Sequence, residues 1–210
     1  MCELILKMSI SIDGFVGETD GGLKWVFGTD HEARAWTVET VWNASLHIMG
    51  SRTFRDMAAY WPASTEEFAP PMNQIPKAVF SRRGPAALKA AGTTAALRDA
   101  RADAEPGHSA ELQPGAESWA EAYVAAGDLD TEVAKLKAQD GKPIIAHGGA
   151  SFARSLIAAG LVDQYVLLVH PIALGKGLPI FSSLTTPRRL ELVSSRRFPA
   201  GTVAQVYRPA

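Results

Sequence analysis

The feature that most constrains the fold is a glycine turn between a buried strand and a helix. Ile144-Ile145-Ala146 is a short apolar run, Gly148 and Gly149 follow, and a helical pattern begins at Ala150. Glycines let the backbone approach a ligand closely, and a helix start offers free N–H groups and the positive end of a dipole. The turn over residues 147–151 therefore predicts a site for dinucleotide phosphates, although a tight turn without a ligand has the same pattern.

Two further strand ends carry residues of the same kind. Gly50-Ser51-Arg52-Thr53 follows an apolar run, where Arg52 or Thr53 can hold a phosphate or simply begin a helix. Ser81-Arg82, with Arg83 after it, can grip a ribose 2′-phosphate, and taken alone it is more often a solvated basic turn. Ligands of open α/β sheets lie at the carboxyl ends of the strands, so all three turns are expected on one edge.

Apolar runs alternate with helical patterns until two strands end the chain. We expect strands at 4–10, 46–49, 78–81, 122–125, 143–146 and 164–169, helices at 30–43, 53–59, 128–139 and 150–159, and a hairpin of 189–198 with 202–207. This predicts a single α/β domain over 1–210, a three-layer α/β/α fold whose mostly parallel central sheet ends in an antiparallel C-terminal hairpin. Residues 84–118 are rich in Ala, Gly, Pro and charge, which predicts a surface insertion with a helix within 86–104.

Composition excludes several classes of function. A net charge of −1 gives no field that favours nucleic acid or an anionic membrane, and we expect neither as a partner. The single cysteine, Cys2, cannot form an internal disulfide, and no run approaches the ~20 apolar residues of a membrane span. A cytoplasmic protein is expected. The five histidines have no metal-ligand spacing, so no metal site is expected.

The order of these pieces resembles the dihydrofolate reductase-like superfamily. The chain is most similar to the branch that contains the C-terminal reductase domain of bifunctional riboflavin biosynthesis proteins. The resemblance rests on the segments 8–17, 49–54, 60–62, 79–82, 147–151, 161–164 and 171–181, which span nearly the whole chain. The chain departs from that pattern at Ser51, where the family usually has arginine, and in the insertion before Trp119.

The resemblance implies NADPH as cofactor. Its phosphates and adenosine ribose would contact residues of the three turns, namely Gly50, Ser51, Arg52, Thr53, Ser81, Arg82, Gly148, Gly149, Ala150, Ser151 and Phe152. Ser9, Val16 and Gly17 would lie beside the nicotinamide. The Gly148–Gly149 peptide would be cis, as in dihydrofolate reductases.

The catalytic side offers two carboxylates. Dihydrofolate reductases place a carboxylate five residues after the Trp of a Leu-Pro-Trp motif, and Asp30 has that spacing from Trp25, although Lys24 replaces the proline. Asp30 equally suits a helix N-cap, and Asp13, the second candidate, equally suits an Asp-Gly turn. The substrate would enter near Val16, Trp25, Asp30 and Phe54, and the rings of Trp25 and Phe54 can stack on a planar ligand or belong to the core.

These observations predict an NADPH-dependent reductase of a small pterin-like or pyrimidine-like heterocycle. A reductase-like module that binds a nucleotide without catalysis is the alternative, and only the Asp30 argument separates the two. A purely structural homodimer, paired through the C-terminal hairpin, is a third interpretation.

Overall fold

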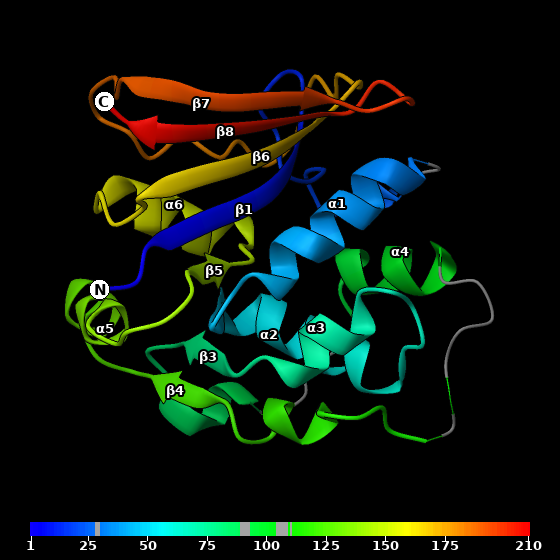
Figure 1. Ribbon diagram of the computed structural model, residues 1–210, viewed down its shortest axis with the longest axis vertical. Coiled ribbons are helices and arrows are strands. Elements are labelled where there is room, and N and C mark those ends of the chain that lie inside the picture. The colour runs from blue at the N-terminus through cyan, green and yellow to red at the C-terminus, as the bar shows by residue number, and fades with distance from the viewer. Residues whose placement is uncertain (28–29, 89–92, 104–108, 110) are drawn as a thin grey trace.

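The computed structural model describes residues 1–27, 30–88, 93–103, 109 and 111–210, which are built around one eight-stranded sheet (Figure 1). Across the sheet the strands run in the order β4-β3-β2-β5-β1-β6-β8-β7. Their bounds are β1 Leu4–Ser11, β2 Leu46–Gly50, β3 Lys77–Phe80, β4 Tyr123–Ala125, β5 Ile144–Ala146, β6 Gln164–His170, β7 Leu190–Arg197 and β8 Val203–Pro209.

The sheet is parallel from β4 to β6 and antiparallel at its C-terminal hairpin. β1 pairs in parallel with β5 and β6, and β2 pairs in parallel with β3 and β5. β8 runs antiparallel to both β6 and β7. This topology confirms the α/β fold with a mostly parallel sheet and an antiparallel hairpin that the sequence predicts.

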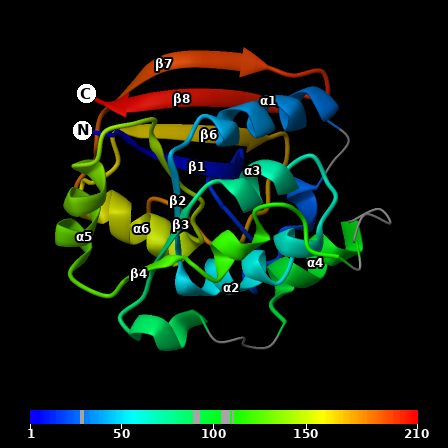
Figure 2. The same ribbon diagram turned by 60° about the horizontal axis from the view of Figure 1, so that its bottom comes forward.

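Helices cover both faces of the sheet. They are α1 His31–Trp42, α2 Ser51–Ala58, α3 Ala69–Gln74, α4 Ala95–Asp103, α5 Leu129–Lys137 and α6 Ala150–Ala158. Figure 2 separates α5 and α6 on one side of the sheet from α1, α2 and α3 on the other. Because side chains of a strand alternate between faces, Leu4 and Leu6 of β1 pack with α5 and α6, while Ile5 packs toward α1. Lys7 therefore faces the same layer as Ile5.

The region from 84 to 118 is described in parts. It contains the 3-10 helix η3 (Gly84–Leu88), helix α4 and the start of the 3-10 helix η4 (Ala116–Trp119), while 89–92, 104–108 and 110 lie outside the described residues. α4 does not stand clear of the molecule, because Leu97 is buried and the Asp99 carboxylate accepts a hydrogen bond from Leu23 N–H at 2.8 Å. α4 thus packs on the loop that ends in the 3-10 helix η1 (Lys24–Val26).

Strand β7 forms one edge of the sheet and is largely exposed. Leu192 and Val193 are each 52% exposed, and the strand bulges between Leu192 and Ser194. Pairing of two copies through this hairpin stays a prediction. Among the helices in the described part of the chain, none is long and apolar enough to cross a membrane.

Candidate functional site

A cavity of about 1700 Å³ lies at the carboxyl ends of the parallel strands. All three predicted turns reach it, through Gly50, Ser51, Arg52, Thr53, Ser81, Arg82, Gly149, Ala150, Ser151 and Phe152. At its other end it is lined by Lys7 and Ser9 of β1 and by His170 of β6. Sites for one small ligand usually occupy roughly 300–1,000 Å³, so this cavity has room for a cofactor and a substrate together.

Two helices begin at this cavity without a side-chain cap. Gly50 precedes α2 and Gly149 precedes α6, and no side chain accepts a hydrogen bond from either first turn. In contrast, Asp30 caps α1 and Asp128 caps α5. Free N–H groups and the positive end of the helix dipole make an uncapped helix start attractive to anions. The cavity therefore receives two anion-binding helix starts from neighbouring strands.

Arginines add positive charge at the same end. Arg52 and Arg55 extend from α2, and Arg82 and Arg83 follow β3. Within the described ranges, none of their guanidinium groups makes an ion pair or a side-chain hydrogen bond. Arginine binds phosphate oxygens through a planar fork of donors. The residues at this end suit a ligand with several phosphate groups, which fits a phosphorylated dinucleotide.

The glycine turn keeps a trans peptide. The expected cis bond between Gly148 and Gly149 is wrong, because Gly148 takes a φ of +78° and turns the chain without it. A Cβ at Gly148 would also contact the sulfur of Met8, the flexible end of that side chain, so it is the positive φ that favours glycine here. Gly148 itself lies outside the cavity lining, while Gly149 donates its N–H to Thr53 Oγ1 at 2.7 Å. The two phosphate turns are thus bonded to each other.

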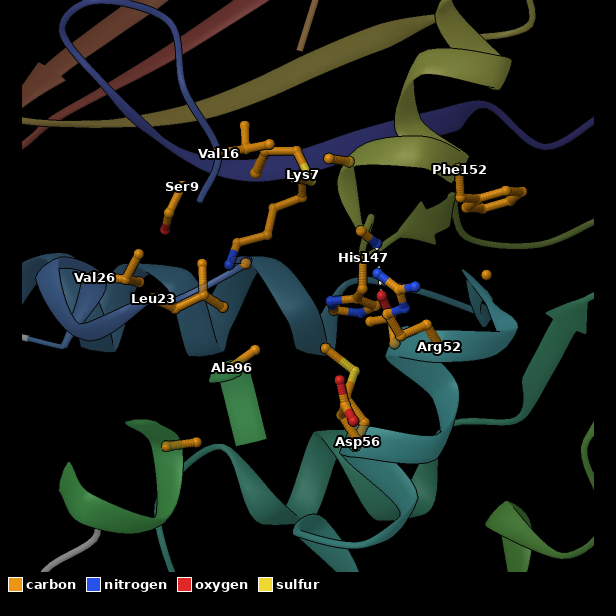
Figure 3. A pocket seen from close by; sticks show the side chains of 18 of the residues that line it. Lys7, Ser9, Val16, Leu23, Val26, Arg52, Asp56, Ala96, His147 and Phe152 are labelled. Carbon is orange, nitrogen blue, oxygen red and sulfur yellow. Dashed lines mark hydrogen bonds between the residues drawn. The ribbon is translucent and has the colours of Figure 1, made fainter. Parts of the chain in front are cut away.

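Lys7 is one of the cavity residues that were not predicted from the sequence. Its side chain extends from β1 into the cavity (Figure 3), and in the described part of the chain no group forms a hydrogen bond or ion pair with its amine. Burial lowers the pKa of Lys7 to about 8. The sequence does mark Lys7 as unusual, because it is the one charged residue of an otherwise apolar run from Leu4 to Met8. A half-buried lysine without a partner in an apolar strand is costly and calls for a reason.

Three nitrogen atoms near Lys7 also lack partners. Trp25 Nε1, His147 Nε2 and His170 Nε2 are buried without a hydrogen-bond partner, and all three residues line the cavity. Burial lowers the pKa of His147 and His170, the latter to about 4, so both rings are neutral at pH 7. Trp25 meets His170 edge-on at 5.4 Å between ring centroids. Buried polar atoms normally have partners, so these atoms are available to a bound ligand.

Asp30 lies in the cavity wall, as the sequence predicts. One carboxylate oxygen accepts from Ala33 N–H and the other from Ala200 N–H, both at 3.1 Å. The structure therefore shows the helix cap that was one of the two interpretations, and it gives Asp30 a second task in holding the β7–β8 turn. Whether Asp30 also takes part in chemistry stays a prediction.

Besides Gly148 and Gly17, two predicted site residues do not line the cavity, namely Asp13 and Phe54. The Asp13 carboxylate bonds the Ser11 hydroxyl and accepts from Leu174 and Gly175 N–H, and these bonds lower its pKa. Asp13 thus makes the contacts of the Asp-Gly turn in the alternative interpretation, and a catalytic role for it stays a prediction.

Phe54 is the second of these two residues. On α2, successive side chains are 100° apart, so Arg52, Arg55 and Asp56 share one face while Phe54 points away. Phe54 is 2% exposed and packs against Trp119 in the core, with 5.6 Å between ring centroids. Phe54 thus has the core position that the sequence equally allowed, and a contact with substrate stays a prediction. Val16 and Trp25, the other two candidates, line the cavity, and Gly17 lies just outside it.

Helix α2 and helix α4 together form the wall opposite β1. Asp56 lines the cavity, and one of its oxygens accepts from the Thr94 hydroxyl at 2.9 Å. Ala95, Ala96 and Ala100 present a small apolar surface beside it. Figure 3 shows Asp56 and Ala96 on the side of the cavity away from β1. Neither the Asp56 carboxylate nor this wall was predicted, since both depend on how distant segments pack.

No cluster of three or more His, Cys, Asp or Glu side chains able to hold a metal ion occurs in the ranges that the structure describes.

Comparison with known proteins places this geometry among reductases in fold. The chain aligns over its full length with a diaminohydroxyphosphoribosylaminopyrimidine deaminase/5-amino-6-(5-phosphoribosylamino)uracil reductase of Thermotoga maritima, at 18% identity and a TM-score of 0.64, and spans 57% of that protein. It is also similar to the dihydrofolate reductase of Enterococcus faecalis complexed with NADP(H), at 13% identity and a TM-score of 0.58, with 99% of this chain and 96% of that one covered.

Sequence comparisons give a relative and a family. The chain is 43% identical over 76 residues to an uncharacterized protein of Bacillus subtilis (strain 168), YyaP, an alignment that covers 36% of this chain and 40% of that relative. Residues 3–204 match the sequence profile of the family described as the RibD C-terminal domain. The chain, with its dihydrofolate reductase-like fold, belongs to the family of RibD C-terminal domains.

Proposed function

We propose that this protein is an NADPH-dependent reductase of a small planar heterocycle of the pyrimidine or pterin kind. The observation that carries the proposal is one continuous cavity, which has uncapped helix starts and arginines at one end and the half-buried Lys7 at the other. Family membership supports a reductase, and the NADP(H) bound to the Enterococcus faecalis enzyme of the same fold supports the cofactor.

The residues of this chain fit NADPH. The uncapped starts of α2 and α6 suit the diphosphate bridge, and Ser81, Arg82 and Arg83 suit the 2′-phosphate. The Ser81 hydroxyl accepts from Arg83 N–H at 3.1 Å, which holds this turn in place. Ser9 and Val16 lie further along the cavity, toward Lys7. When bound, the cofactor supplies a hydride to an electrophilic carbon of the substrate.

Lys7 is proposed to supply the proton. Reduction of a C=N or C=O bond adds a hydride to carbon and a proton to the heteroatom, and the Lys7 ammonium donates that proton and becomes a neutral amine. Solvent then restores the ammonium. A pKa of about 8 suits this task, because the amine is mostly protonated at pH 7 and yet releases its proton readily.

The surroundings of Lys7 favour a neutral substrate edge with acceptor atoms. The Lys7 amine and Trp25 Nε1 are donors without partners, and the neutral ring of His170 can donate or accept. Such donors suit a carbonyl oxygen or a ring nitrogen. Both atoms occur on pyrimidines and pterins.

Binding and turnover test the proposal separately. We expect NADPH to raise the melting temperature of the protein in a saturable way, with a clearly larger effect than NADH at equal concentration. We then expect NADPH oxidation with a member of a panel of oxo- and aminopyrimidines and pterins. Equal stabilisation by NADH contradicts the assignment of the 2′-phosphate site. Binding of NADPH without turnover on any ligand that also binds favours the non-catalytic module.

A further inference from the structure

Helix α4 lies in the cavity wall, although the sequence marks its segment as an insertion. Its start is docked on α2, because the Thr94 hydroxyl accepts from Leu97 N–H at 3.2 Å and donates to Asp56 at 2.9 Å. Leu97 is buried, and the helix also lines the cavity through Ala95, Ala96 and Ala100. The insertion therefore contributes a wall to the cavity, and the contacts of α4 bear on what the cavity binds.

Asp99 of α4 holds the loop that precedes η1. Its side chain is 14% exposed, and one carboxylate oxygen accepts from Leu23 N–H at 2.8 Å. The loop approaches this carboxylate closely, since a Cβ at Gly22 would lie 3.2 Å from the same oxygen. Arg98 lies 3.8 Å from the carboxylates of Asp20 and Asp99, but ion pairs with an exposed arginine contribute little. The bond from Leu23 to Asp99 is therefore the main polar tie between α4 and this loop in the described part of the chain.

Leu23 in turn fixes the position of Trp25. Leu23 is the residue before η1, and its carbonyl accepts from Val26 N–H at 2.8 Å. The N–H of Leu23 is thus held by α4, while its carbonyl closes the turn that carries Trp25. Leu23, Trp25 and Val26 all line the cavity, which Leu23 and Val26 face in Figure 3. The Trp25 ring meets the His170 ring edge-on, with 5.4 Å between ring centroids.

We infer that Asp99 is a positioning residue of the ligand site, which holds Leu23 and thereby sets the place of Trp25 in the cavity wall. Trp25 Nε1 is buried without a partner in the residues that the structure describes, so it is a hydrogen-bond donor for a bound ligand. Asp99 itself does not line the cavity. Its loss would therefore misplace this donor without removing a group that contacts the ligand. The consequence for catalysis rests on the proposed function, whereas the placement of Trp25 does not.

The place of Trp25 can be measured without a ligand. The protein is labelled with 5-fluorotryptophan, and the fluorine resonance of Trp25 is assigned by its loss in Trp25→Phe. In Asp99→Ala we expect this resonance to shift or broaden and the Leu23 amide to exchange its hydrogen faster, because the N–H has lost its acceptor. Asp99→Asn keeps an acceptor oxygen and should retain the wild-type resonance. Asp103→Asn, at an exposed position of α4, should change neither readout.

Two outcomes of the fluorine measurement overturn the inference. The first is an unchanged Trp25 resonance in Asp99→Ala. The second is an equal change in the other tryptophan resonances, because it would mean that Asp99 maintains the fold as a whole rather than the place of Trp25.

A double-mutant cycle tests the consequence for catalysis. NADPH is saturating, and the acceptor is the oxo- or aminopyrimidine or pterin that wild type reduces fastest. We expect Asp99→Ala and Trp25→Phe each to lower kcat/KM by about tenfold, and the double variant to lose little more than either, since both changes remove the same contact. Asp99→Asn should recover most of the wild-type value. Additive losses overturn the inference. Reduction of none of these compounds contradicts the proposed function instead, and the fluorine resonance then decides the role of Asp99 alone.

Discussion

Gly149 donates its backbone N–H to the hydroxyl oxygen of Thr53 at 2.7 Å, and this bond joins the two helix starts of the anion-binding end. Gly50 N–H adds a longer bond to the Gly148 carbonyl at 3.4 Å. Thr53 thus holds the turn after β5 in position against α2. Its hydroxyl hydrogen remains available to a phosphate.

Thr53→Val should weaken both the fold and cofactor binding. Valine has the shape of threonine but cannot accept the Gly149 N–H, and a buried donor left unpaired costs about 1–3 kcal/mol. We expect a loss of unfolding free energy in that range, measured by urea denaturation, together with weaker NADPH binding by calorimetry. Thr53→Ser keeps the acceptor and is the matched control. Similar affinities for the two variants would show that the bond does not organise the site.

The pH dependence of turnover should report on Lys7. If the Lys7 ammonium donates the proton, the active form exists below its pKa, so kcat should be high at low pH and fall as the pH rises through about 8. His147 and His170 stay neutral over this range, because burial lowers the pKa of each ring. Lys7→Met should lower kcat by about 10²–10⁴-fold and abolish the decline. A decline near pH 8 that persists in Lys7→Met would assign it to another group.

Discrimination between NADPH and NADH should depend on Arg82. A guanidinium facing the 2′-phosphate contributes only to the cofactor that has this group. Arg82→Ala is therefore expected to weaken NADPH binding by about tenfold or more and to leave NADH binding nearly unchanged. The exposed Arg197 of β7 lies on a distant strand, and Arg197→Ala controls for the loss of one positive charge. Equal losses for both cofactors would place Arg82 away from the 2′-phosphate.

Asp30→Asn distinguishes a helix cap from a catalytic carboxylate. Asparagine can still cap α1 through its carbonyl oxygen, but it cannot accept from Ala33 and Ala200 with two oxygens. We expect a loss of about 1 kcal/mol in unfolding free energy and turnover within a few-fold of wild type. A large fall in kcat without loss of stability would give Asp30 a chemical role.

The sequence predicted the sheet well because its signals are local. Short apolar runs indicate buried strands wherever they fold, and the glycines at 50, 148 and 149 mark strand ends directly. The face of a helix on which a side chain lies, and the residues that it contacts, were harder to predict. Phe54 was a candidate because its ring can stack on a planar ligand, and its burial against Trp119 depends on a residue far along the chain.

The cavity wall formed with α4 and the surroundings of Lys7 depend on contacts between residues far apart in the sequence. Asp56 meets Thr94 from the insertion, and Trp25 meets His170, so neither neighbourhood can be seen from spacing. Lys7 is different, because a lone charge in a buried strand is visible in the sequence. The cost of burying such a charge is itself a reason to consider the residue functional.

Lys77 provides a prediction about stability that is independent of the site. Its amine is buried, donates to the Asn73 carbonyl at 2.8 Å, and lies 4.7 Å from the centre of the Trp119 ring. Burial lowers its pKa to about 7, against 10.5 as the ordinary value. Between these values the unfolded chain holds a proton that the folded protein has released, so this group makes stability rise with pH there and fall as the pH drops toward 7. The slope of the unfolding free energy against pH is at most about 1.4 kcal/mol per pH unit.

Urea denaturation from pH 6 to 10 tests this. The free energy of unfolding of wild type should rise relative to that of Lys77→Met as the pH rises, and Lys24→Met is the exposed control. A constant difference between wild type and Lys77→Met across this range would mean that Lys77 stays charged in the fold.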